Sequence, residues 1–238
     1  MKHCFNLRTN IIMCSLSAMI IFLFPLIARS QEQLKTPDAA YGLDQTLYNG
    51  KKYSYRPPPG TNGTQYLVSQ LFFYGTVTLK GKTYHEVILN YDIFNQQLLL
   101  QYSDEHDPLN VIEISKAWLT RFSLDSMNFE YLRLDQGPNI YQVLGDGPVR
   151  ILYFWRKSLN LNDVIGTSNF VFSKPVRDAY LLKEGKLLPF NSKRSLVRHF
   201  DAAKRAEIKS YLRKNKIRIN RTSDKAMTDA INFIGKIR

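Results

Sequence analysis

The feature that most limits the fold is a series of short runs rich in aromatic and β-branched residues, extending from residue 65 to residue 190. Each run has the composition of a β-strand, and the runs recur at roughly 8–12-residue intervals. The predicted strands cover residues 66–80, 83–92, 97–102, 111–115, 118–122, 129–134, 140–144, 149–156, 169–173, 179–183 and 187–190, with one more short strand around 52–56. Nothing between them is long enough for a crossover helix, so we expect an antiparallel sheet.

Turn signals separate the predicted strands. Gly81-Lys82 joins two of them as a β-hairpin, and Gly145-Asp146-Gly147-Pro148 precedes 149–156, the most strand-like run of the chain. This pattern predicts an antiparallel β-domain at residues 65–190, arranged as a meander, a barrel or a sandwich. The predicted fold class is mainly β (α+β), because helices follow this domain.

After residue 190, the apolar residues change from a strand period to a helical one. From Leu196 to Tyr211 they recur at three- and four-residue steps, which predicts an amphipathic helix over 195–214. A second helix begins at Ser223 or Asp224, both of which are common N-terminal capping residues. The C-terminal segment, 191–238, is therefore expected to form a pair of basic amphipathic helices on or beside the sheet.

Positive charge is concentrated in this C-terminal segment. The chain has 33 Lys and Arg against 20 Asp and Glu. Residues 181–238 hold 16 basic and 5 acidic side chains, whereas residues 31–180 hold 14 and 15. The candidate binding residues on the first predicted helix are Arg198, Arg205, Lys209 and Arg213, which fall nearly in one line, together with Lys193 and Arg194 just before them. The alternative interpretation is a solvated outer face.

The first thirty residues have the layout of a secretory signal peptide. Lys2, His3 and Arg8 precede an apolar run over 11–27, and Ala28-Arg29-Ser30 places small residues before a cut ahead of Gln31. An uncleaved anchor is the alternative, but the run is shorter than the ~20 residues of a spanning helix. We therefore expect no transmembrane span after processing. Residues 31–64 are predicted to be an extended linker that contains three consecutive prolines.

No catalytic or metal-binding pattern stands out. Cys4 and Cys14 both lie in the predicted signal peptide, so the mature chain is expected to lack disulfides and thiol chemistry. His85, His106 and His199 have no metal-ligand spacing, and 104–107 is predicted to be a solvated loop. The sequence also has no serine elbow and no phosphate-binding loop. The sequence therefore predicts a non-enzyme with no metal and no cofactor.

Several segments carry a resemblance to known sequences. They are Tyr74-Gly75-Thr76-Val77, Lys80-Gly81-Lys82-Thr83-Tyr84, Tyr91-Asp92, Phe200-Asp201-Ala202-Ala203-Lys204 and the run over 208–217. In these segments the chain resembles a group of uncharacterised exported proteins of Gram-negative Bacteroidota. The resemblance implies export and no particular activity. The chain ends in a predicted helix and does not resemble the β-sandwich sorting domain that many of these bacteria use for secretion, so we expect the periplasm rather than the extracellular space.

The favoured function is a non-catalytic envelope protein that binds through its basic C-terminal helix. The expected partner is an envelope protein, an anionic envelope polymer or lipid headgroups, because export argues against nucleic acid. A small-ligand carrier with a barrel cavity is one alternative, and a hydrolase with an unrecognised site is another. A hollow barrel would favour the carrier, and a cleft holding His85 or His106 beside two carboxylates would favour the hydrolase. A filled core with an exposed basic stripe would favour the first function.

Overall fold

The structure, a computed structural model, describes residues 41–42, 44–103, 109–164 and 167–237. The signal-peptide prediction and the 104–107 loop lie outside these residues. The described strands are β1 (Gly50–Lys52), β2 (Phe73–Leu79), β3 (Lys82–Asp92), β4 (Gln97–Tyr102), β5 (Asn110–Ile114), β6 (Leu119–Leu124), β7 (Met127–Leu134), β8 (Gly137–Leu144), β9 (Val149–Arg156), β10 (Leu159–Val164), β11 (Thr167–Phe172), β12 (Val176–Lys183) and β13 (Lys186–Pro189). The described helices are α3 (Lys193–Arg198), α4 (Ala202–Lys214) and α5 (Asp224–Lys236).

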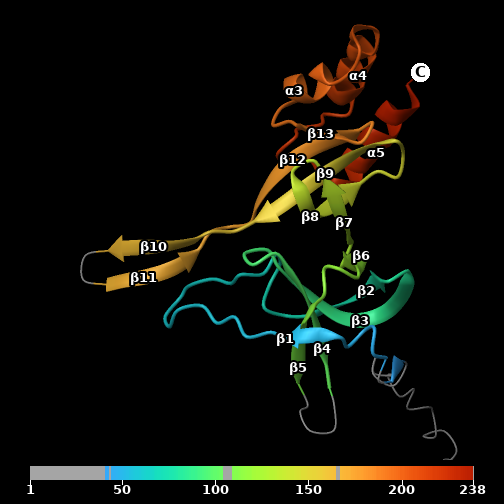
Figure 1. Cartoon of the computed structure of the whole chain (residues 1–238). Coiled ribbons are helices and arrows are strands. Elements are labelled where there is room, and N and C mark those ends of the chain that lie inside the picture. The colour runs from blue at the N-terminus through green and yellow to red at the C-terminus, as the bar shows by residue number, and fades with distance from the viewer. Residues whose placement is uncertain (1–40, 43, 104–108, 165–166, 238) are drawn as a thin grey trace, which may run out of the picture.

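Eleven of the described strands form one antiparallel sheet in the order β1-β5-β4-β3-β2-β6-β7-β8-β9-β12-β13. It consists of two meanders, joined where β6 returns to pair with β2 (Figure 1). β1 and β13 are separate edges, so the sheet is open and does not close into a barrel. The predicted fold class is confirmed: a mainly antiparallel β-protein with C-terminal helices.

The remaining two strands, β10 and β11, form an arm that leaves the sheet between β9 and β12 (Figure 1). The sequence predicted β11 but not β10, whose Asn160 and Asn162 are poor strand formers. Leu161 pairs directly with Phe170 across the arm, and their exposed fractions are 53% and 36%. The base of the arm is attached to the preceding chain, because Asn62 exchanges backbone hydrogen bonds with Phe170 and Phe172.

The first hydrophobic core fills the half of the sheet built from β2 to β7, and aromatic rings occupy its centre. Phe122 stacks on Phe129 with ring centroids 4.7 Å apart, and Tyr91 meets both rings edge-on. Tyr84 and Val87 are fully buried beside them. Aromatic cross-strand pairs of this kind explain why the aromatic-rich runs of the sequence fold as strands.

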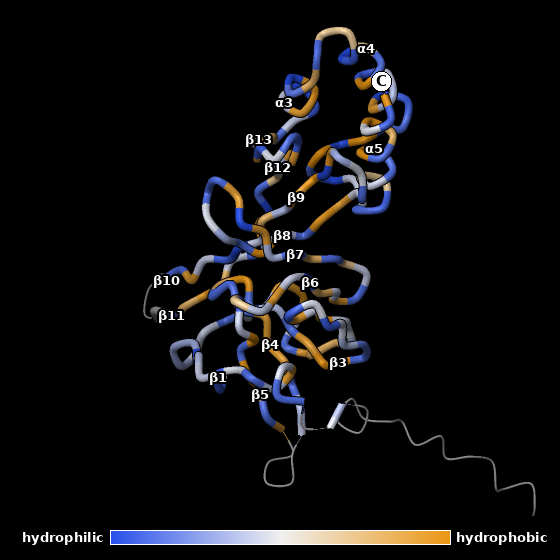
Figure 2. The backbone as a smooth tube through the Cα atoms, turned by 45° about the vertical axis from the view of Figure 1, so that its right-hand side comes forward, coloured by the Kyte–Doolittle hydropathy of each residue, from blue (hydrophilic) through white to orange (hydrophobic). Residues whose placement is uncertain are grey.

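The second hydrophobic core lies between the other half of the sheet and the three helices: α5 packs on β8 and β9, and α3 and α4 stand beyond it at the end of the molecule (Figure 1). Ile151 and Leu181 of the sheet pack with Ile208 of α4 and Ile231 of α5, all fully or almost fully buried. Figure 2 shows hydrophobic residues in both halves of the molecule. Trp155 packs against both cores and so connects them.

The prediction of one continuous helix over 195–214 is wrong: the segment forms two helices, α3 and α4, with a break at 199–201. His199 ends α3, and Asp201 stands at the N-terminus of α4. The guanidinium group of Arg205 donates hydrogen bonds to the carbonyl oxygens of Phe200 and Arg198, at 2.7 and 3.1 Å. Arg205 therefore satisfies carbonyl groups that a continuous helix would have bonded itself.

Candidate functional site

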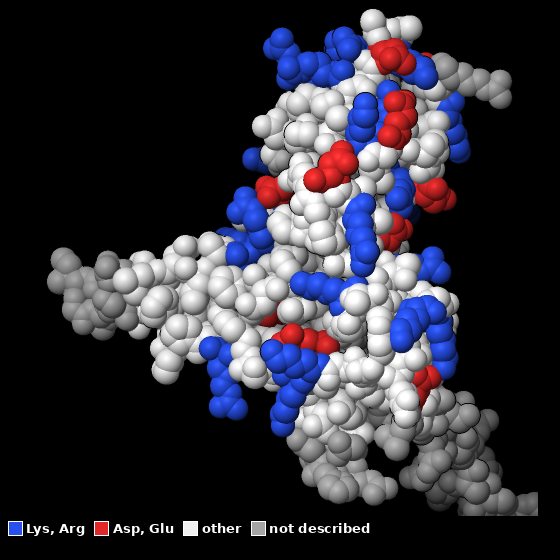
Figure 3. Space-filling model, in the orientation of Figure 1, with Lys and Arg blue, Asp and Glu red and all other residues white. Residues whose placement is uncertain are grey.

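The six predicted binding residues lie on α3 and α4, at one end of the molecule. They are Lys193, Arg194 and Arg198 on α3, and Arg205, Lys209 and Arg213 on α4; we call this set the basic helical surface. Figure 3 shows Lys and Arg side chains gathered at this end. The helices are held in place by Leu196, Ile208 and Leu212, which point into the second core.

Two members of the basic helical surface have structural contacts. Arg205 is partly buried and bonds the carbonyl oxygens at the break, and Lys193 donates from Nζ to the carbonyl oxygen of Leu212 at 3.4 Å. Lys193 thereby connects α3 to the end of α4. These two cations contribute to the helix–helix junction, which sequence spacing could not show.

The other four members are exposed, and within the described part of the chain they have no ion pair and no side-chain hydrogen bond. They are Arg194, Arg198, Lys209 and Arg213, which we call the four free cations. Exposed Lys214, Lys216, Arg218 and Arg221 follow on the same end of the chain. Asp201 and Glu207 are the acidic residues of α3, α4 and the segment up to Arg221. The positive charge of this surface is thus left largely uncompensated.

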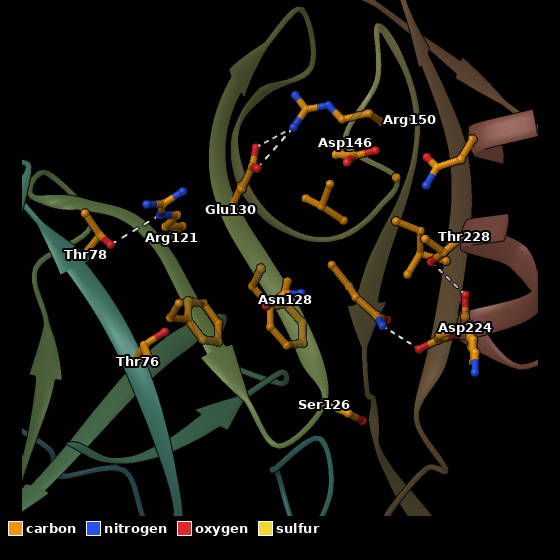
Figure 4. Close-up of a pocket in the computed structure, with 18 of the residues that line it drawn as sticks. Thr76, Thr78, Arg121, Ser126, Asn128, Glu130, Asp146, Arg150, Asp224 and Thr228 are labelled. Atoms are coloured by element: carbon orange, nitrogen blue, oxygen red, sulfur yellow. Dashed lines mark hydrogen bonds and ion pairs between the residues drawn. The ribbon is translucent and has the colours of Figure 1, made fainter. Parts of the chain in front are cut away.

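A cleft of about 900 Å³ lies where the two halves of the sheet diverge (Figure 4). The β7–β8 ladder ends at the pair Phe129 and Gln142, and the β8–β9 ladder begins at that same Gln142. Beyond this point β7 stays with β6 while β8 follows β9, so the strands separate. Helix α5 lines the opening with Asp224 and Thr228.

The cleft is polar, and several of its charges are already paired. Arg150 donates from Nη1 to both carboxylate oxygens of Glu130, at 2.9 and 3.1 Å. Asp224 accepts from Gln142 Nε2 at 2.6 Å and from Arg177 Nη1 at 3.0 Å. These contacts fix the positions of β7, β9 and the start of α5 around the opening.

Arg121 is the exception among the cleft arginines. It is exposed, and its side chain makes one long contact, from Nε to the hydroxyl oxygen of Thr78 at 3.4 Å, within the described part of the chain. Asp146 and Asp229, across the cleft, are also exposed and make no ion pair with any residue that the structure describes. The cleft therefore offers unpaired groups of both signs.

The histidines lie apart. His85 lines the cleft from a β-bulge, where strict alternation is interrupted, and both it and the next residue, Glu86, are exposed. His199 contacts the carbonyl oxygen of Pro189 at 3.0 Å, and His106 lies outside the described residues. Within the described ranges, no cluster of three His, Cys, Asp or Glu could hold a metal ion.

Sequence reasoning missed the cleft, because its walls come from six strands and a helix far apart in the chain. The available signal was a set of polar side chains at alternate strand positions, such as Thr76 and Thr78, or Asn128 and Glu130. Alternation shows that these residues share a face, but it does not show where two ladders diverge.

Comparisons with known proteins give no relative. No family model matches the chain, and neither a curated protein nor a solved structure matches it. The resemblance to exported proteins of Bacteroidota therefore stays a prediction. Among the described residues, no helix is both long enough and apolar enough to cross a membrane.

Proposed function

We propose that this protein is a non-catalytic component of the cell envelope that binds an anionic surface through the basic helical surface. The observation that carries the proposal is the state of the four free cations: each is exposed and, within the described chain, unpaired. Guanidinium and ammonium groups left without carboxylate partners are available to phosphate groups.

The helices hold these charges on a firm base. Leu196 and Val197 of α3 and Ile208 and Leu212 of α4 are buried in the second core. The cations therefore project from helices that are packed against the rest of the protein. A basic residue near an anionic membrane surface contributes ~1 kcal/mol to binding. Four such residues together bind an anionic surface much more tightly than one charge alone.

The predicted signal peptide supports an envelope location, in which phosphate-bearing lipid headgroups are the abundant polyanions. The two alternatives have weaker support. The carrier requires a closed barrel, whereas the sheet is open. The hydrolase requires a histidine beside two carboxylates. His85 lines the same cleft as Glu130, Asp224, Asp146 and Asp229, but its ring bonds none of them, and Glu130 and Asp224 already bond other side chains.

The test is binding to vesicles of phosphatidylglycerol, with phosphatidylcholine vesicles for comparison. The variant Arg198→Gln/Lys209→Gln/Arg213→Gln removes three free cations and leaves Arg205, which holds the helix junction, in place. We expect the triple variant to bind phosphatidylglycerol on the order of 100-fold more weakly, since three contributions of ~1 kcal/mol are lost.

The matched control removes the same charge elsewhere. Lys51, Arg133 and Lys174 are exposed residues outside the helices, and their triple replacement by Gln should leave vesicle binding nearly unchanged. Equal losses in the two triple variants would show that net charge, rather than this surface, drives binding. If the wild-type protein does not bind the vesicles but captures a protein from envelope extract in a salt-sensitive way, the partner is a protein instead.

A further inference from the structure

The cleft is a second candidate binding site, separate from the basic helical surface. It is lined by strands of the sheet and by α5, whereas the free cations lie on α3 and α4. We propose that this cleft binds a neutral oligosaccharide. The proposal does not depend on the vesicle-binding function, because it uses none of the same residues.

The size and shape of the cleft fit such a ligand. Its volume of about 900 Å³ lies within the range of small-molecule sites, roughly 300–1,000 Å³. Figure 4 shows its two sides: Thr78, Arg121 and Glu130 lie on the sheet side, and Asp224 and Thr228 lie on α5. A chain of sugar rings can contact both sides at once.

The sheet side presents hydrogen-bonding groups in rows. The strand register aligns Thr76, Ser123 and Asn128 in one row and Thr83, Thr78, Arg121 and Glu130 in the next. The hydroxyl groups pair within the rows, Thr76 with Ser123 at 2.8 Å and Thr78 with Thr83 at 2.9 Å. A hydroxyl oxygen in such a pair keeps acceptor capacity. Ser123 Oγ and Thr78 Oγ1 each accept one further bond, from the backbone N–H of Thr76 and from Arg121 Nε, so the hydroxyl groups with capacity left for a ligand are those of Thr76 and Thr83.

Two planar groups stand in these rows with unused hydrogen-bonding capacity. The guanidinium of Arg121 has its long contact to Thr78 through Nε, and both of its Nη groups are free of the described residues. The exposed amide of Asn128 is likewise unpaired within the described chain and offers both a donor and an acceptor. Planar forks of this kind suit the paired hydroxyl groups of a sugar ring, which present two oxygens side by side.

The charge balance of the cleft favours a neutral ligand. Exposed Arg121 and Lys225 face a space shared with exposed Asp146 and Asp229, and the other carboxylates, Glu130 and Asp224, are paired. An anionic ligand would meet the two free carboxylates, and a cationic ligand would meet Arg121 and Lys225. A ligand with many hydroxyl groups and no charge is repelled by neither pair of groups and can form hydrogen bonds with both.

The test is calorimetric titration of the full mature chain with three hexasaccharides: one of glucose, one of N-acetylglucosamine and one of a uronic acid. We expect at least one neutral hexasaccharide to bind and the uronate to bind at least tenfold more weakly. Arg121→Ala and Asn128→Ala should each weaken the neutral ligand by tenfold or more. Ser126→Trp, at an exposed position of the β6–β7 turn that lines the cleft, should block it.

The matched control is Arg133→Ala, an exposed arginine on the same strand as Asn128 but outside the cleft, which should bind like the wild type. Unfolding temperatures of all variants should match the wild type, since each replaced side chain is exposed. Failure of both neutral hexasaccharides to bind would overturn the proposal. So would tighter binding of the uronate, or equal effects of Arg121→Ala and Arg133→Ala.

Discussion

At the scale of single residues, polar contacts attach the two ends of the described chain to the sheet. Near the start, the Asp44 carboxylate pairs with Lys82 and accepts from the Tyr84 hydroxyl at 3.0 Å. Near the end, Asp224 bonds Gln142 and Arg177. The indole of Trp155 donates to Gln142 Oε1 at 2.7 Å, which extends this contact into the sheet.

Asp44 should make stability depend on pH in the acid range. The hydrogen bond from Lys82, together with those from Tyr84 and the backbone, lowers the pKa of Asp44 from 3.8 to about 2. The ionised carboxylate therefore stabilises the fold above pH ~4, and this contribution is lost as the pH falls towards 2. Thermal unfolding should show Asp44→Asn less stable than the wild type at pH 7 and equal to it below pH 2. A constant difference at both pH values would contradict this assignment.

Asp224 should be important for the attachment of α5. Asp224→Ala leaves Arg177 and the buried amide of Gln142 without their acceptor, which should cost about 2–3 kcal/mol of unfolding free energy. The matched control is Asp229→Ala, on the exposed side of the same helix, which should change the unfolding free energy by less than ~0.5 kcal/mol. Urea unfolding of both variants measures the difference, and similar losses would refute the role of Asp224.

The sequence allowed Asp224 or Ser223 as the start of the last helix, and the structure divides the roles. Ser223 caps the helix by accepting from the backbone N–H of Ala226, while the Asp224 side chain turns to the sheet. Local sequence patterns could predict the start of the helix. They could not predict the bonds to Gln142 and Arg177, because these partners lie 82 and 47 residues away in the chain.

At the scale of elements, the β8–β9 turn is fitted closely to α5. Gly145 has a φ of +87°, and a Cβ atom at this position would lie 2.7 Å from Ile231 Cγ2. Gly137, the first residue of β8, has a similar φ of +92° but open space around it. A comparison of the two glycines therefore separates the cost of a strained backbone from the cost of contact with α5.

Replacing each of these glycines by alanine should have unequal effects. Both variants bear the cost of a left-handed backbone, about 1–2 kcal/mol. Gly145→Ala also forces α5 away and should lose a further ~1–3 kcal/mol. Chemical denaturation of the two variants measures the difference. If Gly137→Ala is as destabilising as Gly145→Ala, then contact with α5 does not matter at this turn.

Strand composition predicted most elements, and 97–102 and 149–156 match β4 and β9 residue for residue. The failures have physical reasons. The β10 strand forms by pairing with β11 despite its asparagines, and residues 66–72 are not a strand although they resemble one in composition. The break between α3 and α4 depends on Arg205, which helical spacing alone assigned to the exposed basic line.

At the scale of the whole molecule, one continuous sheet connects the two larger hydrophobic cores, and a smaller cluster of Tyr141, Leu152 and Leu182 lies in the same half of the sheet as the second. The β7–β8 ladder crosses from one half to the other, and Trp155 packs against both cores. Because no boundary interrupts the hydrogen-bonded ladders, the two halves should unfold together.

Core variants in the two halves test this cooperativity. Leu89→Ala in the first core and Ile231→Ala in the second should each lower stability by about 2–5 kcal/mol. Near-ultraviolet and far-ultraviolet circular dichroism should report one shared transition in each variant. Two separated transitions, with only one shifted by each variant, would show that the halves fold independently.

The charges of the molecule are distributed unevenly between the two proposed binding surfaces. The basic helical surface keeps four free cations, whereas the cleft balances Arg121 and Lys225 against Asp146 and Asp229. Electrostatic binding by the former should weaken with salt, because exposed charges are screened over roughly 10 Å at 0.1 M ionic strength. Hydrogen bonding in the cleft should depend on salt far less.

Binding by the basic helical surface is tested by comparing the wild type with Arg198→Gln/Lys209→Gln/Arg213→Gln on phosphatidylglycerol vesicles at low and high salt. We expect the triple variant to bind on the order of 100-fold more weakly at low salt, and this gap in affinity to close as the salt concentration rises. A gap that is absent at low salt, or that persists unchanged at high salt, would contradict the assignment of the basic helical surface as the binding site.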